Sequence, residues 1–111
     1  MHKLPITIAC RGYDRVRPLI DGTVAIEGCD AIVLPLKAEE IFLRAYASAD
    51  FDVSELSMSS HILTTAMGIA RYMAIPVFVS RMFRHASIYV RTDRDINEPA
   101  DLRGKTVGVP E

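Results

Sequence analysis

Arginine, hydroxyl and carboxylate side chains gather in three short polar clusters of this sequence, at residues 11–17, 55–60 and 80–85. Guanidinium groups clamp carboxylates with two parallel hydrogen bonds. Serine hydroxyls and free backbone N–H groups at a helix start can also hold a carboxylate or phosphate. The clusters therefore predict a site for a small organic anion.

Each cluster also has an explanation that involves no ligand. The arginines of the first cluster could mark an ordinary solvated helix start. The serines of the second could serve only as a helix N-cap, and the end of the third could be a surface loop. The residue types alone leave both explanations open for every cluster.

From its residue type, His85 is the best candidate for an acid–base group, because an imidazole titrates near neutral pH. A lone histidine also serves often as a purely structural residue. His61 falls inside a predicted helix and His2 lies at the terminus, so neither is assigned a role.

The elements that must position these clusters alternate between short apolar runs and helical patterns. This order predicts an α/β protein with a mainly parallel sheet flanked by helices. Strands are expected over residues 4–10, 30–34, 51–57, 73–80, 87–91 and 106–109. Helices are expected over 16–20, 38–48 and from Ser57 or Ser59 to about Met67, with a short turn or helix at 96–105.

Two of these helices show an apolar face with helical spacing. Pro76 lies inside one predicted strand and removes a ladder donor, so that strand is expected at an edge, bulged or bent. The two expected buried faces are Ile41, Phe42, Ala45 and Tyr46 in one helix, and Ile62, Leu63, Ala66 and Met67 in the other.

The three polar clusters all follow predicted strands. In open α/β sheets, ligands bind beyond the carboxyl ends of the strands. We therefore expect the clusters to converge on one edge of the sheet, although they are far apart in sequence.

Composition narrows the class of protein. The chain has 111 residues, is 50% hydrophobic and carries a net charge of −1 from 13 basic and 14 acidic residues. Such a chain is too apolar for a disordered tail, and it has no basic stripe typical of a nucleic-acid binder. No apolar run approaches the roughly 20 residues that cross a bilayer.

The cysteines and the start of the chain bear on the compartment. Cys10 and Cys29 are too few for a disulfide framework and lack metal-ligand spacing, so buried free thiols are expected and no metal site is predicted. The apolar stretch after Met1 is too short for a signal peptide and contains Pro5. We expect a cytoplasmic protein, or a periplasmic one if a leader has been removed.

Several segments together resemble a known family. Residues 96–109 look like a segment found in many type II periplasmic-binding-protein folds. A longer set of segments resembles the 4,5-dihydroxyphthalate decarboxylase family, and the match runs from about Leu4 to Glu111. These segments are residues 13–15, 17–19, 39–42, 51–57 and 75–85.

The resemblance implies a two-lobed fold with a ligand cleft between the lobes. Residues 1–91 would form the first part of lobe one. Residues 92–111 would form the crossover and the start of lobe two. Because family members are far longer, we expect this chain to be an N-terminal fragment with an incomplete lobe, which would expose apolar surface and tend to associate.

The resemblance also implies a reaction, the loss of one carboxylate from 4,5-dihydroxyphthalate to give 3,4-dihydroxybenzoate and CO2. His85 would be the proton donor or the partner of the phenol, and Glu55 or Asp14 could serve as a base. The expected substrate-binding residues are Arg11, Tyr13, Ser57, Ser59, Ser60, Arg81 and Arg84.

The family reaction is feasible without an organic cofactor, and none is predicted. A divalent metal at the catechol oxygens stays open, although no metal motif is recognisable. The expected partner is a small aromatic or other organic anion, with a second copy of the chain as a further possibility. The competing hypotheses are a solute-binding protein of the ABC-transporter type, for which the same fold and arginines would suffice, and a truncated product with no function of its own.

Overall fold

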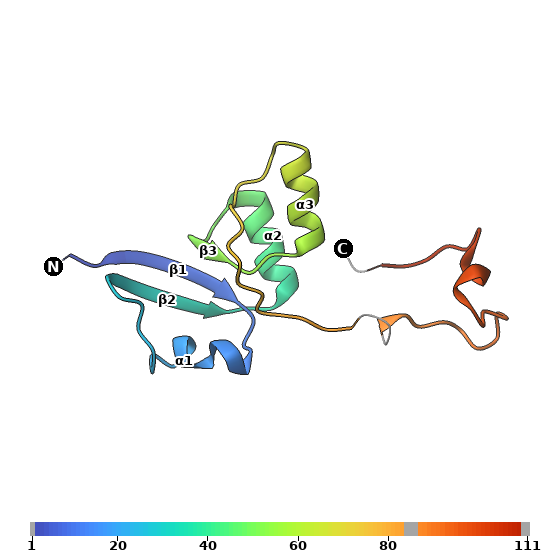
Figure 1. Ribbon diagram of the computed structural model, residues 1–111, viewed down its shortest axis with the longest axis horizontal. Helices are drawn as coiled ribbons and strands as arrows, with labels where there is room; N and C mark the ends of the chain where they lie inside the picture. Colours follow the sequence, from blue (N-terminus) through green and yellow to red (C-terminus); the bar gives the residue numbers. More distant parts are fainter. Residues whose placement is uncertain (1, 84–86, 110–111) are drawn as a thin grey trace. The chain divides into compact units, whose positions relative to one another are not determined.

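A parallel sheet with the strand order β2-β1-β3 organises the first part of the chain. The computed structural model describes residues 2–83 and 87–109 (Figure 1). Strand β1 spans Leu4–Cys10, β2 spans Cys29–Pro35, and β3 is limited to Val53–Ser54. This three-stranded parallel sheet confirms the predicted α/β class.

Helices connect the strands and flank the sheet. The 3-10 helix η1 (Asp14–Val16) and the α-helix α1 (Arg17–Ile20) join β1 to β2, and α2 (Ala38–Ser48) joins β2 to β3. Right-handed crossovers to neighbours on opposite sides of β1 require helices on opposite faces. Figure 1 shows α1 on one side of the sheet and α2 on the other.

The core lies between β1 and α2. Ile41 and Ala45, one turn apart on α2, are fully buried and pack with Ala9 of β1 and with Phe51. The predicted apolar face of α2 is thereby confirmed, and Glu39 and Glu40 occupy the first turn, where the helix dipole favours anions. Partly buried side chains complete this core: Leu34, Leu36, Phe42, Leu56 and Tyr72.

Helix α3 (Met58–Ala66) ends as its sequence predicts but packs differently. Gly68 adopts a φ of 71°, and the N–H groups of Gly68 and Ile69 bond the carbonyls of Thr65 and Thr64. This left-handed glycine ending is the Schellman motif.

The prediction of a buried α3 face is wrong. The helix contains no buried residue, and Ile62, Leu63 and Met67 are 59%, 62% and 68% exposed. The physical reason is the size of the sheet, since a β3 of only two residues offers little surface for α3 to cover. The helical periodicity identified the apolar face correctly without specifying what would pack against it.

Three predicted strands are absent from the described residues. Residues 73–80, 87–91 and 106–109 form no ladder with a neighbour. Around Pro76 the chain instead makes a tight turn, in which the N–H of Val77 bonds the carbonyl of Ile75 at 2.7 Å. A strand exists only when a second strand pairs with it, and an apolar run does not supply that partner.

The chain divides into two compact units, Met1–Ser80 and Arg81–Glu111. The second unit contains the 3-10 helix η3 (Pro99–Leu102). A capping box begins it, in which the Asp101 carboxylate accepts from the N–H of Glu98 at 3.1 Å. Gly104 follows its end, so the expected short helix with a glycine stop is confirmed.

Both cysteines are free thiols, as expected, but only Cys10 is buried and Cys29 is half-buried. Cys29 pairs with Leu4 in the sheet register while Cys10 pairs with Pro35, so the two thiols sit at opposite ends of neighbouring strands. That separation is roughly 20 Å, whereas a disulfide requires Cα atoms within about 7 Å.

A side-chain clamp holds β3 to β1. Asp52 Oδ2 accepts hydrogen bonds from the backbone N–H and the hydroxyl of Thr7, both at 2.8 Å, and the N–H of Asp52 bonds the Thr7 hydroxyl at 3.2 Å. The bonds from Thr7 hold the pKa of the Asp52 carboxyl below its ordinary value. Only the charged carboxylate accepts all of these bonds well.

Replacing Asp52 with Asn should therefore lower stability in a pH-dependent way. A depressed carboxyl pKa stabilises the fold above about pH 4, and that contribution is lost as the pH falls through the native pKa. Urea unfolding from pH 2 to 7 should show wild type and Asp52→Asn converging on acidification. Thr7→Val keeps the backbone donor, so it should lose only part of the stability that Asp52→Asn loses at neutral pH. A stability difference between wild type and Asp52→Asn that stays constant with pH would contradict the clamp.

Candidate functional site

The carboxyl ends of β1 and β3 lie side by side. The strand order changes direction between them, because the chain adds β2 on one side of β1 and β3 on the other. The register pairs Ala9 with Ser54, and β2 lies on the far side of β1. In open parallel sheets, the crevice outside the strands at such a reversal is the usual place for a ligand. The first two polar clusters both open from this point.

Glu55 connects the two strand ends. Its backbone N–H continues the ladder to the carbonyl of Ala9 at 2.8 Å. Its Oε2 accepts from the backbone N–H of Arg11 at 2.8 Å, and its Oε1 accepts from the Tyr13 hydroxyl at 2.7 Å. Both carboxylate oxygens are thus engaged, and the loop after β1 is fixed to the loop after β3.

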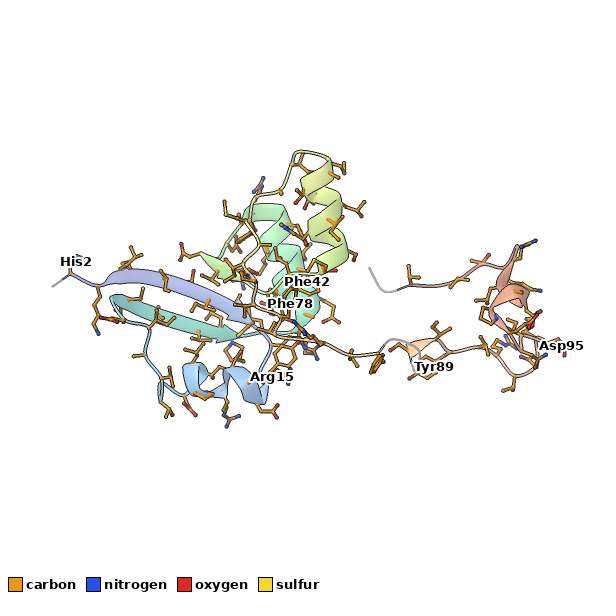
Figure 2. All side chains as sticks on the ribbon, in the orientation of Figure 1. His2, Arg15, Phe42, Phe78, Tyr89 and Asp95 are labelled. Atoms are coloured by element: carbon orange, nitrogen blue, oxygen red, sulfur yellow. The ribbon has the colours of Figure 1, made fainter. Side chains whose placement is uncertain are left out.

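Two guanidinium groups flank the ring of Tyr13. The Cζ of Arg11 lies 5.4 Å from the ring centroid and that of Arg15 lies 4.9 Å from it, within the range of cation–π contacts. Arg15, labelled in Figure 2, comes from η1 and donates from Nη2 and Nε to the carbonyl of Val79 at 2.7 and 3.1 Å. A third segment of the chain therefore joins the site.

The surroundings of Tyr13 keep its hydroxyl protonated. Burial and the hydrogen bond to the Glu55 carboxylate raise the pKa of Tyr13, while Ser80 and Arg11 act in the opposite direction. The neighbouring Cys10 thiol also has a raised pKa, first because it is buried and second because of the Glu55 charge. A neutral phenol and a neutral thiol thus adjoin a carboxylate.

The serine cluster forms the start of α3. Ser57 occupies the N-cap position, but its side chain makes no capping hydrogen bond to the helix. Its Oγ lies 3.0 Å from the Oγ of Ser59 instead. Ser60 is half-buried, and its carbonyl accepts the Thr64 hydroxyl at 2.9 Å. The N-cap explanation thus holds for the position of Ser57 and not for its hydroxyl.

The remaining predicted site residues are placed as follows. Asp14 is exposed in the short turn η1. Arg81 is exposed at the start of the second unit. Arg84 and His85 lie outside the described residues. The structure brings together Arg11, Tyr13 and Glu55, with the serines following Glu55 along the chain.

Arg15 and Ser80 belong to the polar clusters but were not predicted as site residues. A usable signal for Arg15 exists in the spacing, because Arg11 and Arg15 stand two residues before and two residues after Tyr13. In a loop, such spacing lets two guanidinium groups reach one ring. No comparable signal points to Ser80, whose contact depends on where the chain returns.

Metal-ligating side chains do not gather in the described part of the chain. Among residues 2–83 and 87–109, no group of three or more histidine, cysteine, aspartate or glutamate side chains is arranged to hold a metal ion. Across the same residues, no helix has the length and apolarity needed to span a membrane.

Comparison with curated proteins gives two strong matches. The chain is 57% identical over all 111 residues to a 4,5-dihydroxyphthalate decarboxylase of Comamonas testosteroni and 54% identical over 111 residues to one of Pseudomonas putida. The resemblance found in the sequence is confirmed. The chain spans 34% and 43% of the lengths of these two relatives. No protein-family model matches it.

The contact between Glu55 and Tyr13 predicts a shift that can be measured. Because the Glu55 charge helps to raise the pKa of Tyr13, Glu55→Gln should lower that pKa. NMR titration of ring-labelled tyrosine follows the change directly. Asp50→Asn, which removes a carboxylate bound to Arg44 on α2, should leave the Tyr13 titration in place; an equal shift in both variants would contradict a direct contact.

Proposed function

We propose that the protein carrying this chain removes one carboxylate from 4,5-dihydroxyphthalate, giving 3,4-dihydroxybenzoate and CO2. The observation that carries the proposal is the identity of 57% and 54% to two proteins named 4,5-dihydroxyphthalate decarboxylase, over every residue of the chain. These names favour decarboxylation over the alternative of a solute-binding protein for a small organic anion.

The substrate itself supplies the electronic means for this reaction. Each carboxylate of 4,5-dihydroxyphthalate is para to a ring hydroxyl. A proton added to the carbon that bears the carboxylate gives a dienone-like intermediate, which the para oxygen stabilises. The C–CO2 bond then breaks and its electron pair restores the aromatic ring. The protein must supply a proton donor, a partner for the phenol and cations for the second carboxylate.

The site at the ends of β1 and β3 has groups of the required types. The guanidinium of Arg11 is exposed beside Tyr13 and suits a substrate carboxylate. The start of α3 adds the hydroxyls of Ser57 and Ser59 and the positive end of a helix dipole. Ser60 completes this set of groups that would orient the anion.

Other roles follow from the resemblance. Arg81 and Arg84 would complete the carboxylate clamp, and His85 would donate the proton or bind the phenol. Asp14 and Glu55 are the candidate bases. Since both oxygens of Glu55 already accept hydrogen bonds, we propose that it acts through Tyr13.

We also propose the type II periplasmic-binding-protein fold, with residues 1–91 in the first lobe and 92–111 leading to the second. The parallel sheet of order β2-β1-β3 supports this fold, with the candidate site between β1 and β3, where the strand order changes direction. The partner would be a small aromatic anion held between the lobes.

The decisive assay uses a protein that contains this chain and has the length of its curated relatives. Incubation with 4,5-dihydroxyphthalate should release CO2 and form 3,4-dihydroxybenzoate in equal amounts. Tight binding without CO2 release would instead support the solute-binding alternative.

In the active protein, His85→Ala should lower kcat by about 10²–10⁴, the usual contribution of a general acid; unchanged turnover would remove His85 from the mechanism.

Substitution of Arg11 tests the proposed carboxylate clamp. Arg11→Lys keeps the positive charge but loses the two-pronged geometry, so KM should rise about 10- to 100-fold, the equivalent of about 1.5–3 kcal/mol. Arg44→Lys is the matched control, because Arg44 is held on α2 by Glu40 and Asp50 and lies over the ring of Phe51. A KM that is equally affected in both variants would argue against the clamp.

A further inference from the structure

We propose that Tyr13 and Glu55 form a proton relay for the phenol of the substrate. Tyr13 Oη accepts the phenol proton while the Tyr13 proton passes to Glu55 Oε1. This inference rests on the proposed decarboxylation and assigns a new role to Tyr13, which sequence reasoning placed only in substrate binding.

The direction of one hydrogen bond carries the argument. A tyrosine hydroxyl donates a single hydrogen bond and can also accept. Its single donor is directed to the Glu55 carboxylate at 2.7 Å. Any further partner of Oη must therefore be a donor, as Ser80 is. The phenol O–H of the substrate is a donor and meets this requirement.

The arrangement is held in place from several sides, as a relay requires. The second oxygen of Glu55 is tied to the N–H of Arg11 at 2.8 Å, which fixes the carboxylate. Arg11 and Arg15 lie against the ring of Tyr13. The Cys10 thiol is the other titratable group that adjoins Glu55. The positive charge of Arg11 acts to lower the pKa of Tyr13, so it would stabilise negative charge on Oη during transfer.

Proton affinities determine when the relay can act. A carboxylate is a far weaker base than a phenolate, so transfer of the phenol proton of the free substrate to a carboxylate is unfavourable. After a proton has been added to the ring carbon, the para hydroxyl becomes strongly acidic because it bears the positive charge of the ring. Transfer to Glu55 through Tyr13 is then favourable.

The steps balance over one turnover. The donor proton forms a C–H bond at the carbon that bears the carboxylate. The phenol O–H bond breaks, its proton goes to Tyr13 Oη, and the Tyr13 proton goes to Glu55, which leaves a neutral dienone. Cleavage of the C–CO2 bond returns its electron pair to the ring and the oxygen. Glu55 and Tyr13 then return the proton to that oxygen, and solvent reprotonates the donor.

The test compares kcat of wild type, Tyr13→Phe and Glu55→Gln between pH 6 and 10. Tyr13→Phe keeps the ring on which both arginines lie and removes only Oη. At neutral pH each variant should be about 100-fold slower, within the range for acid–base groups. The deficit should shrink as the pH passes the phenol pKa, because an ionised substrate has no phenol proton to pass on.

Tyr72→Phe is the matched control. Tyr72 donates its hydroxyl to the carbonyl of Phe51 at 2.9 Å next to the core, so its loss affects packing without touching the relay. Any deficit in this variant should be the same at every pH. A deficit independent of pH in Tyr13→Phe, or none at all, would overturn the relay and leave decarboxylation standing. Wild type with no turnover would instead overturn the proposed function and the relay with it.

Discussion

The pairing of β3 with β1 is the constraint on which the candidate site depends. Strand β3 has only two residues, so the ladder alone contributes few hydrogen bonds. Side chains hold the junction at both ends, with Asp52 on Thr7 at one end and Glu55 on Arg11 and Tyr13 at the other. Each carboxylate accepts backbone N–H groups, and such charge-assisted bonds are stronger than neutral ones. The polar contacts thus hold β3 against β1, which in a longer strand the backbone ladder alone would do.

The two carboxylates serve different ends of one short strand. Asp52 lies toward the amino end and has a structural role that any parallel pair could use. Glu55 lies at the carboxyl end, where ligands usually bind in open parallel sheets. Its carboxylate supports the loop after β1 and also orients the Tyr13 hydroxyl. Structural support and the proposed chemistry would therefore be combined in one side chain.

Much of the first unit could be predicted from sequence, because its elements follow local rules. Periodicity and capping signals identify β1, α2 and the ends of the helices. The convergence of Arg11 with Glu55 follows from the parallel topology once the strand order is known. The bond from Tyr13 to Glu55 was not predictable, because it depends on the path of a loop.

The prediction failed where an element needs a partner. Residues 73–80 form an apolar run typical of a buried strand, yet no strand pairs with them in the described structure. The apolar side of α3 is exposed for the same reason. Local pattern determines which face of an element is apolar, whereas burial depends on how much surface the rest of the fold supplies.

The contacts of the site join residues that are 42, 44 and 64 positions apart in the chain. Contacts this distant form late, because the entropy of closing long loops must be overcome before they contribute. Helix α2 can form from local interactions, but the Tyr13–Glu55 bond can form only after β3 has docked. During folding, the capacity for chemistry should therefore arise last. A species that has its helices but not its β1–β3 junction would show native-like helical content. It would nevertheless lack the candidate site.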